Sequence, residues 1–264
     1  MISPDLTLDG IAVRRTTVGR DDAPRVVLVH GAMDTGGSFS RLVASLTDVD
    51  TITYDRRGYG DSHLDGRMPN RIAEHADDLL SILDGRPSVV MAHSLGGLVA
   101  LAAAQRDPSV FRGLVAYETP MPWLPWWPPV GLPADVNDIP QVTAAATRFL
   151  RAHMGDERWA ALTDTQRDGL LTCGPAWATE LSDAQNRGPV FEFAQIAVPV
   201  LAVHGSLTDD RHVNGARVLA RSVPNGRLAT IEGAGHIGHR RQPAELASLI
   251  VEQIAATANP QERA

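Results

Sequence analysis

Residues 88–105 read SVVMAHSLGGLVALAAAQ, and this stretch places a serine between two kinds of secondary structure. Residues 88–92 form a short apolar run with β-branched side chains, which is typical of a buried strand. Residues 95–104 are rich in leucine and alanine, which favours a helix. Only His93 and Ser94 lie between the two patterns. The sequence therefore predicts a sharp strand-to-helix turn that contains Ser94.

Strand and helix patterns alternate on both sides of this turn. Apolar runs of strand length occupy 25–31, 49–55, 113–118, 198–205 and 226–233. Apolar side chains at helical spacing occupy 38–46, 70–83, 213–223 and 243–254. Near the start of the chain, Asp9 and Gly10 predict the turn of a hairpin. This alternation predicts an α/β fold with a mostly parallel, doubly wound sheet.

The alternation stops between residues 119 and 197. This segment begins with TPMPWLPWWPPVGLP at 119–133, and proline at that density excludes a sheet interior or a long helix. Helices are expected after it, at 139–153 and at 157–172. We therefore expect a single α/β domain that carries residues 119–197 as an insertion.

The composition narrows the range of partners. The net charge is −7 and is spread along the chain, which argues against nucleic-acid binding. Cys173 is the only cysteine, so neither an intrachain disulfide nor a cysteine metal site is expected. Residues 1–19 lack the pattern of a signal peptide, and no apolar run reaches the ~18 residues that span a bilayer. We expect a cytoplasmic protein without a membrane partner, and its oligomeric state stays open.

Reactive side chains follow the ends of several predicted strands, where ligands bind in an open α/β sheet. Ser94 is the candidate nucleophile, because Ala92 and Gly96 leave room for a turn that lifts its hydroxyl clear of the backbone. The alternative role for this serine is a helix N-cap. His236, in the glycine-rich loop after the last strand, is the candidate base, and His239 is its nearest competitor.

A histidine base needs a carboxylate that fixes its tautomer and stabilises the imidazolium. Asp209 is the first choice, because it lies in the loop after the strand that precedes the His236 strand. Asp210 is its immediate rival. Glu118 is a third candidate, because it follows a different strand at the same edge of the sheet. A carboxylate without this role would be an N-cap or turn residue.

Backbone N–H groups should stabilise the oxyanion that forms when the nucleophile attacks a carbonyl. The N–H of Leu95 follows the candidate nucleophile at the start of a helix, where donors are free. The second donor should come from the loop after 30–31. Ala32 is the simplest choice for this donor, and Met33 is the alternative.

Four motifs in a fixed order resemble those of the α/β-hydrolase superfamily. They are HGAMDTGGSF from His30, YDRRGYGDS from Tyr54, AHSLGG from Ala92 and GAGH from Gly233. The resemblance covers essentially the whole chain and implies about eight mostly parallel strands with a small helical lid after the sixth. The core would then be 1–118 and 198–264, and the lid 119–197. The family's chain order of serine, acid and histidine is satisfied by Ser94, Asp209 and His236.

Two departures from the family pattern affect the site. Ala92 replaces the first glycine of the serine motif, which keeps a small residue there. In the loop after 198–205, Thr208 stands where the family places its acid, and the two aspartates follow one and two residues later. Glu118 therefore remains an alternative acid.

Together these residues predict a serine hydrolase that cleaves an ester or related acyl compound of a small molecule, without a metal or organic cofactor. An apolar or aromatic pocket is expected. Its candidate lining residues are Met33, Trp123, Trp126 and Trp127. The tryptophans could instead anchor the insertion to the core. The fold also allows a lyase, a cyclase, a cofactor-free oxygenase or a ligand receptor.

Overall fold

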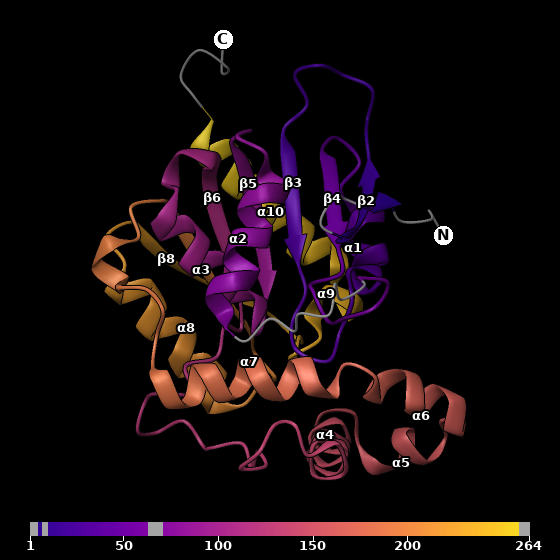
Figure 1. Cartoon of the computed structure of the whole chain (residues 1–264). Coiled ribbons are helices and arrows are strands. Elements are labelled where there is room, and N and C mark those ends of the chain that lie inside the picture. Colours follow the sequence, from indigo (N-terminus) through magenta and orange to yellow (C-terminus); the bar gives the residue numbers. More distant parts are fainter. Residues whose placement is uncertain (1–4, 7–9, 63–70, 259–264) are drawn as a thin grey trace.

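A mostly parallel, eight-stranded sheet forms the centre of the computed structural model, which describes residues 5–6, 10–62 and 71–258 (Figure 1). The strand order is β1-β2-β4-β3-β5-β6-β7-β8. The strands are β1 (Asp5–Leu6), β2 (Ala12–Thr16), β3 (Arg25–Val29), β4 (Asp50–Tyr54), β5 (Ser88–His93), β6 (Phe111–Tyr117), β7 (Val200–Gly205) and β8 (Gly226–Ile231). β2 pairs antiparallel with β1 and β4, and β3 to β8 run parallel to one another. The predicted fold class is confirmed.

The strands follow the predicted apolar runs closely. Every residue of β5 and β7 is buried, as expected for parallel strands that are covered on both faces. β1 and β2 pair antiparallel as the expected hairpin requires, although Asp9 of its turn lies outside the described residues. The central strands therefore form a rigid platform whose carboxyl ends lie along one edge.

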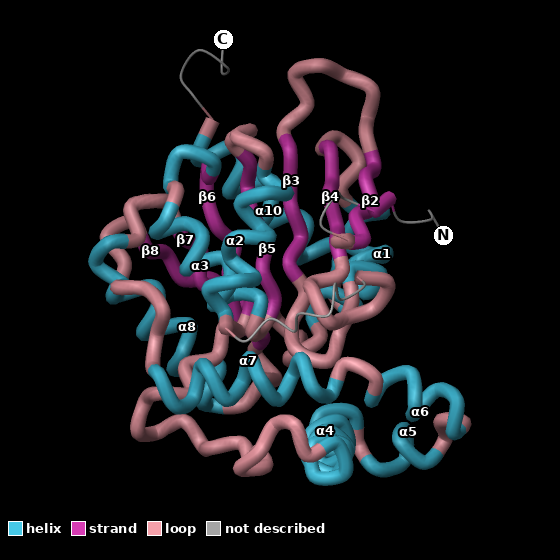
Figure 2. Tube along the Cα trace, in the orientation of Figure 1, coloured by secondary structure: helices cyan, strands magenta, loops and turns pink. Residues whose placement is uncertain are grey.

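Helices cover both faces of the sheet (Figure 2). On one face pack α2 (Ile72–Leu83), α3 (Gly96–Arg106) and α8 (Asp210–Ser222). On the other face pack η1 (Gly36–Phe39), α1 (Ser40–Ser45) and α10 (Pro243–Thr257). The short helix α9 (Gly238–Arg241) directly precedes α10 in the sequence. Alternate strand residues supply the two cores, so Val27 and Val90 face the first and Leu28 and Met91 the second.

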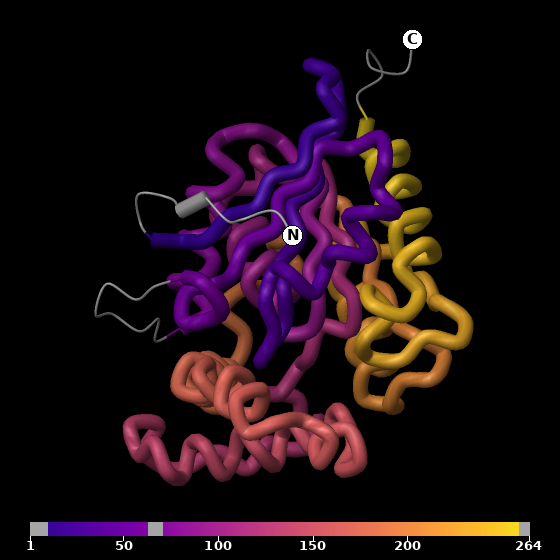
Figure 3. The backbone as a smooth tube through the Cα atoms, turned by 90° about the vertical axis from the view of Figure 1, so that its right-hand side faces the viewer, coloured from indigo at the N-terminus to yellow at the C-terminus, as the bar shows by residue number. Residues whose placement is uncertain are grey.

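The segment between β6 and β7 forms a helical layer across the carboxyl ends of the strands (Figure 3). Its elements are α4 (Ile139–Met154), α5 (Asp156–Ala160), α6 (Asp164–Leu171), α7 (Gly174–Arg187) and η3 (Phe193–Gln195). α4 confirms the helix expected at 139–153. The single helix expected at 157–172 is wrong, because the Thr163 hydroxyl accepts from the Gln166 N–H and starts a new helix. The sequence patterns did not indicate α7.

Candidate active site

Ser94 lies at the turn between β5 and α3, with a left-handed backbone (φ 50°) that is strained for a residue with a side chain. There is little free space around this turn. A Cβ on Gly96 would lie 2.6 Å from the His30 carbonyl oxygen, and one on Gly31 would lie 2.9 Å from the Ser94 Cβ. The Ser94 N–H donates to the Tyr117 carbonyl at 2.8 Å. The predicted sharp turn is confirmed, and close backbone approach explains its small neighbours.

His236 follows β8, and its ring contacts the carboxylate of Glu118, which follows β6. His236 Nδ1 lies 2.7 Å from Glu118 Oε2. Glu118 is 0% exposed, and it also accepts from the Gly205 N–H at Oε1 and from the Thr208 hydroxyl at Oε2, each at 2.9 Å. These contacts fix the carboxylate and place the imidazole proton on Nδ1. The ring's Nε2 is then the nitrogen that can accept a proton.

The structure does not bring Asp209 or Asp210 to the candidate base, contrary to the first sequence-based choice. The Asp209 side chain is 65% exposed and forms an ion pair with Arg211 at 2.9 Å. Asp210 is exposed and begins α8. The physical reason lies in the loop after β7. This loop brings Thr208 to Glu118, and α8 begins directly afterwards with both aspartates facing outward.

The rings of His93 and His212 pack closely against His236. His93 Nε2 donates to the His236 carbonyl at 2.8 Å, and the ring of His212 lies 4.5 Å from the His236 ring. His212 Nδ1 is also 3.9 Å from Glu118 Oε2. Burial is the main cause that lowers the pKa of both neighbouring rings, that of His212 to about 2 and that of His93 well below its usual range. Both rings are therefore neutral at pH 7.

A cavity of about 610 Å³ contains Ser94 and His236 and separates the sheet edge from the helical layer. Ala32 and Met33 line its core side, as expected for Met33. Apolar side chains from the helical layer line the opposite side, namely Phe149, Leu150, Met154 and Leu170. The cavity can therefore take an apolar group next to the serine hydroxyl.

The three tryptophans of the proline-rich segment do not line this cavity. Trp127 is buried and packs edge-on against His212, with ring centroids 5.2 Å apart. Trp123 packs edge-on against Phe191 at 6.1 Å, and Trp126 is 43% exposed. The expectation that they line the pocket is wrong, because their segment packs beside α8 and leaves the cavity to α4 and α6. Trp127 instead anchors the insertion to α8 through His212.

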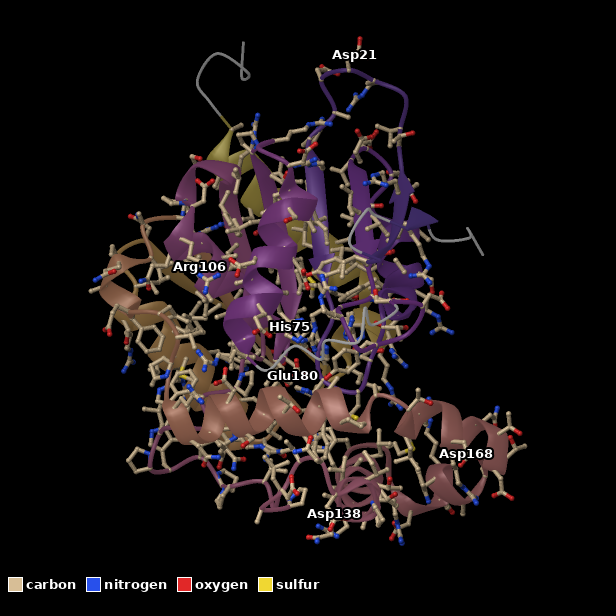
Figure 4. The ribbon with its side chains drawn as sticks, in the orientation of Figure 1. Asp21, His75, Arg106, Asp138, Asp168 and Glu180 are labelled. Carbon is tan, nitrogen blue, oxygen red and sulfur yellow. The ribbon has the colours of Figure 1, made fainter. Side chains whose placement is uncertain are left out.

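A buried ion pair, which no sequence pattern indicated, joins the helical layer to the edge of the sheet that carries Ser94. Arg56 and Glu180 are both 0% exposed, and Arg56 Nη2 donates to Glu180 Oε1 at 3.2 Å while Nη1 donates to Oε2. Arg56 also donates from Nε to the His30 carbonyl and from Nη2 to the Gly31 carbonyl, each at 3.0 Å. Glu180 on α7 faces His75 on α2 (Figure 4), whose Nε2 lies 3.3 Å from Oε2. The pair thus holds the loop after β3.

Neighbouring charged and polar groups keep the buried Glu180 carboxylate ionised beside Arg56. Burial by itself would raise the pKa of Glu180, but the Arg56 guanidinium and the His75 ring lower it to about 2. The Tyr59 hydroxyl donates to the same carboxylate, and burial raises the pKa of that tyrosine well above its usual range. Arg56 and Glu180 are 124 positions apart in sequence, so no local pattern could have paired them.

Among the residues that the structure describes, two groups of side chains have donor atoms close enough to share a metal ion, within 4.8 Å of one another in each group. The groups are Glu118–His212–His236 and Asp34–His93–His239. In the first, hydrogen bonds already occupy both oxygens of Glu118. In the second, Arg240 Nη2 lies 2.6 Å from Asp34 Oδ1, and a guanidinium at this distance opposes cation binding. His239, the competing candidate base, lies 3.6 Å from Asp34.

Comparison with known proteins agrees with this architecture. The sequence model of the alpha/beta hydrolase family matches residues 26–249 of this chain. The chain therefore belongs to this family and is an α/β-hydrolase enzyme. It is 26% identical over 278 residues to the AB hydrolase superfamily protein YfhM of Bacillus subtilis (strain 168), covering 93% of this chain and 95% of that relative.

Solved structures of other family members share the fold. A thermophilic esterase from Thermogutta terrifontis has a TM-score of 0.71 at 20% identity, with 98% of each chain covered. An enol-lactonase from Burkholderia xenovorans LB400 also has a TM-score of 0.71 at 20% identity, with 94% of this chain and 98% of that one covered. At this level of sequence identity, the structural similarity establishes the fold alone. The substrate has to be inferred from the residues of the site. Among the described residues, no helix has the length and apolarity to cross a bilayer.

Proposed function

We propose that the protein is a serine hydrolase in which Ser94 is the nucleophile, His236 the general base and Glu118 the acid of the triad. The observation that carries this assignment is the 2.7 Å contact between His236 Nδ1 and Glu118 Oε2, in a site that also holds Ser94. A fully buried carboxylate with this contact holds the ring in one tautomer and stabilises the imidazolium that forms during catalysis. Asp209 has neither the burial nor the contact.

The proposed reaction proceeds in two stages. The Ser94 Oγ attacks the acyl carbon while His236 Nε2 takes its proton, and the same ring then protonates the leaving group. Water, activated by His236, hydrolyses the acyl-enzyme and releases the acid. The N–H groups of Leu95 and Ala32 are the proposed oxyanion donors, with Met33 as the alternative to Ala32. Leu95 stands directly before α3, where backbone donors lack intrahelical acceptors.

The substrate proposed is a carboxylic ester or thioester of a small molecule with an apolar acyl group. The side of the cavity formed by α4 and α6 carries Phe149, Leu150 and Leu170, which exclude water from an acyl chain placed at Ser94. We propose that residues 119–197 act as a lid on the core formed by 1–118 and 198–264, because this segment supplies that side.

Three matched carboxylate variants test the triad. We expect Glu118→Gln to lower kcat for a short-chain ester by on the order of 10³–10⁴-fold, because the amide no longer enforces the tautomer. Asp209→Asn and Asp210→Asn should retain kcat within about threefold, because exposed carboxylates at a helix start contribute little to a buried site. A larger loss in Asp209→Asn than in Glu118→Gln would overturn the assignment.

A fluorophosphonate probe tests the nucleophile separately. We expect the probe to label the wild-type protein on Ser94 and to leave Ser94→Ala unlabelled. Well-folded wild-type protein that resists labelling, and that turns over no ester in a panel of increasing acyl length, would contradict the serine mechanism. Such a result would favour a ligand receptor or a non-hydrolytic enzyme of the same fold.

A further inference from the structure

A second cleft opens beside the catalytic cavity and carries four arginines. Its volume is about 550 Å³. The four arginines come from three elements of the fold, Arg41 from α1, Arg158 from α5, and Arg240 and Arg241 from α9. None of the eight described residues that line this cleft is acidic. We call it the arginine cleft.

The arginine cleft adjoins the catalytic cavity. Arg158, Ile237 and Arg240 line both spaces, and Ile237 directly follows the candidate base His236. One molecule can therefore place its reacting carbonyl at Ser94 and extend a tail between α5 and α9.

The charge of the cleft is mostly uncompensated. Asp34 pairs with Arg240 at 2.6 Å. Within the part of the chain that the structure describes, Arg41, Arg158 and Arg241 form no ion pair, and all three are exposed. Arg41 Nη1 donates to the Arg240 carbonyl at 3.3 Å. Three unpaired guanidinium groups around one cleft repel one another, and they contrast with the net charge of −7 on the whole chain. An anion would relieve this repulsion.

We propose that the arginine cleft binds the phosphate groups of the substrate's leaving group, so that the substrate class is an acyl thioester or ester with a phosphorylated tail. This inference rests on the proposed function. Guanidinium groups bind phosphate oxygens through paired, charge-assisted hydrogen bonds. The opposite side of the catalytic cavity is apolar, which assigns the acyl chain to α4 and α6 and the phosphorylated portion to α5 and α9.

Two thioesters with the same acyl group test this assignment. Butyryl-coenzyme A carries phosphates, and the butyryl thioester of N-acetylcysteamine has the same reacting centre without them. For the wild-type protein we expect kcat/KM to be at least about tenfold higher for the coenzyme A thioester, mainly through a lower KM. Inorganic phosphate should inhibit hydrolysis of the coenzyme A thioester competitively. Equal kcat/KM values for the two thioesters would overturn the proposal.

Substitutions of the cleft arginines test whether the preference for the coenzyme A thioester arises in the arginine cleft. Arg158→Gln and Arg241→Gln should each bring the ratio of the two kcat/KM values down by about fivefold or more. Arg217→Gln, which removes an arginine from α8 outside the cleft, should leave that ratio unchanged. A ratio that stays at the wild-type value in both cleft variants would contradict the assignment. The same comparison between a glycerophosphate ester and its dephosphorylated counterpart distinguishes a phosphorylated alcohol from a phosphorylated thiol.

Direct binding separates this proposal from the proposed function. Coenzyme A should bind the Ser94→Ala protein in isothermal titration, and Arg241→Gln in that background should weaken binding by about fivefold or more. The absence of binding would overturn the cleft assignment even if Ser94-dependent hydrolysis of the neutral thioester is observed. Binding without any turnover of either thioester would instead contradict the hydrolase mechanism and leave the phosphate site standing.

Discussion

The substitution Glu180→Gln should destabilise the fold strongly, because it removes the counter-charge of a fully buried arginine. The amide has nearly the same shape as the carboxylate, so packing is preserved and the change is electrostatic. Removing one partner of a buried ion pair costs about 3–5 kcal/mol. The lowering of the Glu180 pKa from 4.5 to about 2 corresponds to about 3 kcal/mol, which agrees with that range. Each kcal/mol lowers Tm by about 2–4 °C in a chain of this size, so we expect a loss of about 10 °C.

Thermal and denaturant unfolding of the two proteins at pH 7 measure this loss. The matched control is Asp156→Asn, which removes an exposed carboxylate that lies 2.7 Å from Arg151 Nε in the same helical layer. Exposed ion pairs contribute little, so the control should keep a Tm close to the wild-type value. If Glu180→Gln unfolds at the same temperature as the control, the charge of Glu180 does not stabilise the fold.

The same contribution should depend on pH with a defined sign. The pKa of Glu180 is lower in the folded protein than in the unfolded chain, so the carboxylate stabilises the fold above pH 4.5. That stabilisation is lost as the pH falls from 4.5 to about 2. The difference in unfolding free energy between wild type and Glu180→Gln should therefore shrink over this range. A difference that stays constant from pH 7 to pH 3 would refute the electrostatic explanation.

Two further predictions concern the turn at the candidate nucleophile. In differential scanning fluorimetry, the Tm of Ser94→Gly should be about 2–4 °C above that of Ser94→Ala. Glycine relieves about 1 kcal/mol of strain in the left-handed backbone, and alanine keeps that strain. Equal Tm values for the two variants would show that the turn is not strained. Gly96→Ala should lower both Tm and the rate of ester hydrolysis, because its Cβ would lie 2.6 Å from the His30 carbonyl oxygen. Gly37→Ala, whose Cβ would lie 3.6 Å from Thr35 Oγ1, is the control for that clash, and equal Tm values for the two alanine variants would contradict it.

The sequence by itself determined the architecture and the turn at Ser94. Strand and helix periodicity are local properties, so the apolar runs and helical stripes identified the parallel strands and the helices that cover the sheet. The small residues around Ser94 likewise reported a local crowding that the structure shows directly. Periodicity failed in the insertion, where a threonine cap divides one expected helix and α7 was not recognised.

Only the tertiary structure decided which carboxylate contacts His236 and what holds the loop after β3 in place beside Ser94. Glu118, Asp209 and Asp210 all follow strands that end at this edge, and chain position favoured Asp209, whereas the structure places Glu118 at the His236 ring. The direction of each side chain depends on how the loops after the strands fold. The loop after β7 covers Glu118, and α8, which begins directly after this loop, carries the two aspartates outward. The pairing of Arg56 with Glu180 depends in the same way on packing between segments that are remote in the chain. Contacts of this kind are properties of the folded chain, because no local pattern records which distant side chains will meet.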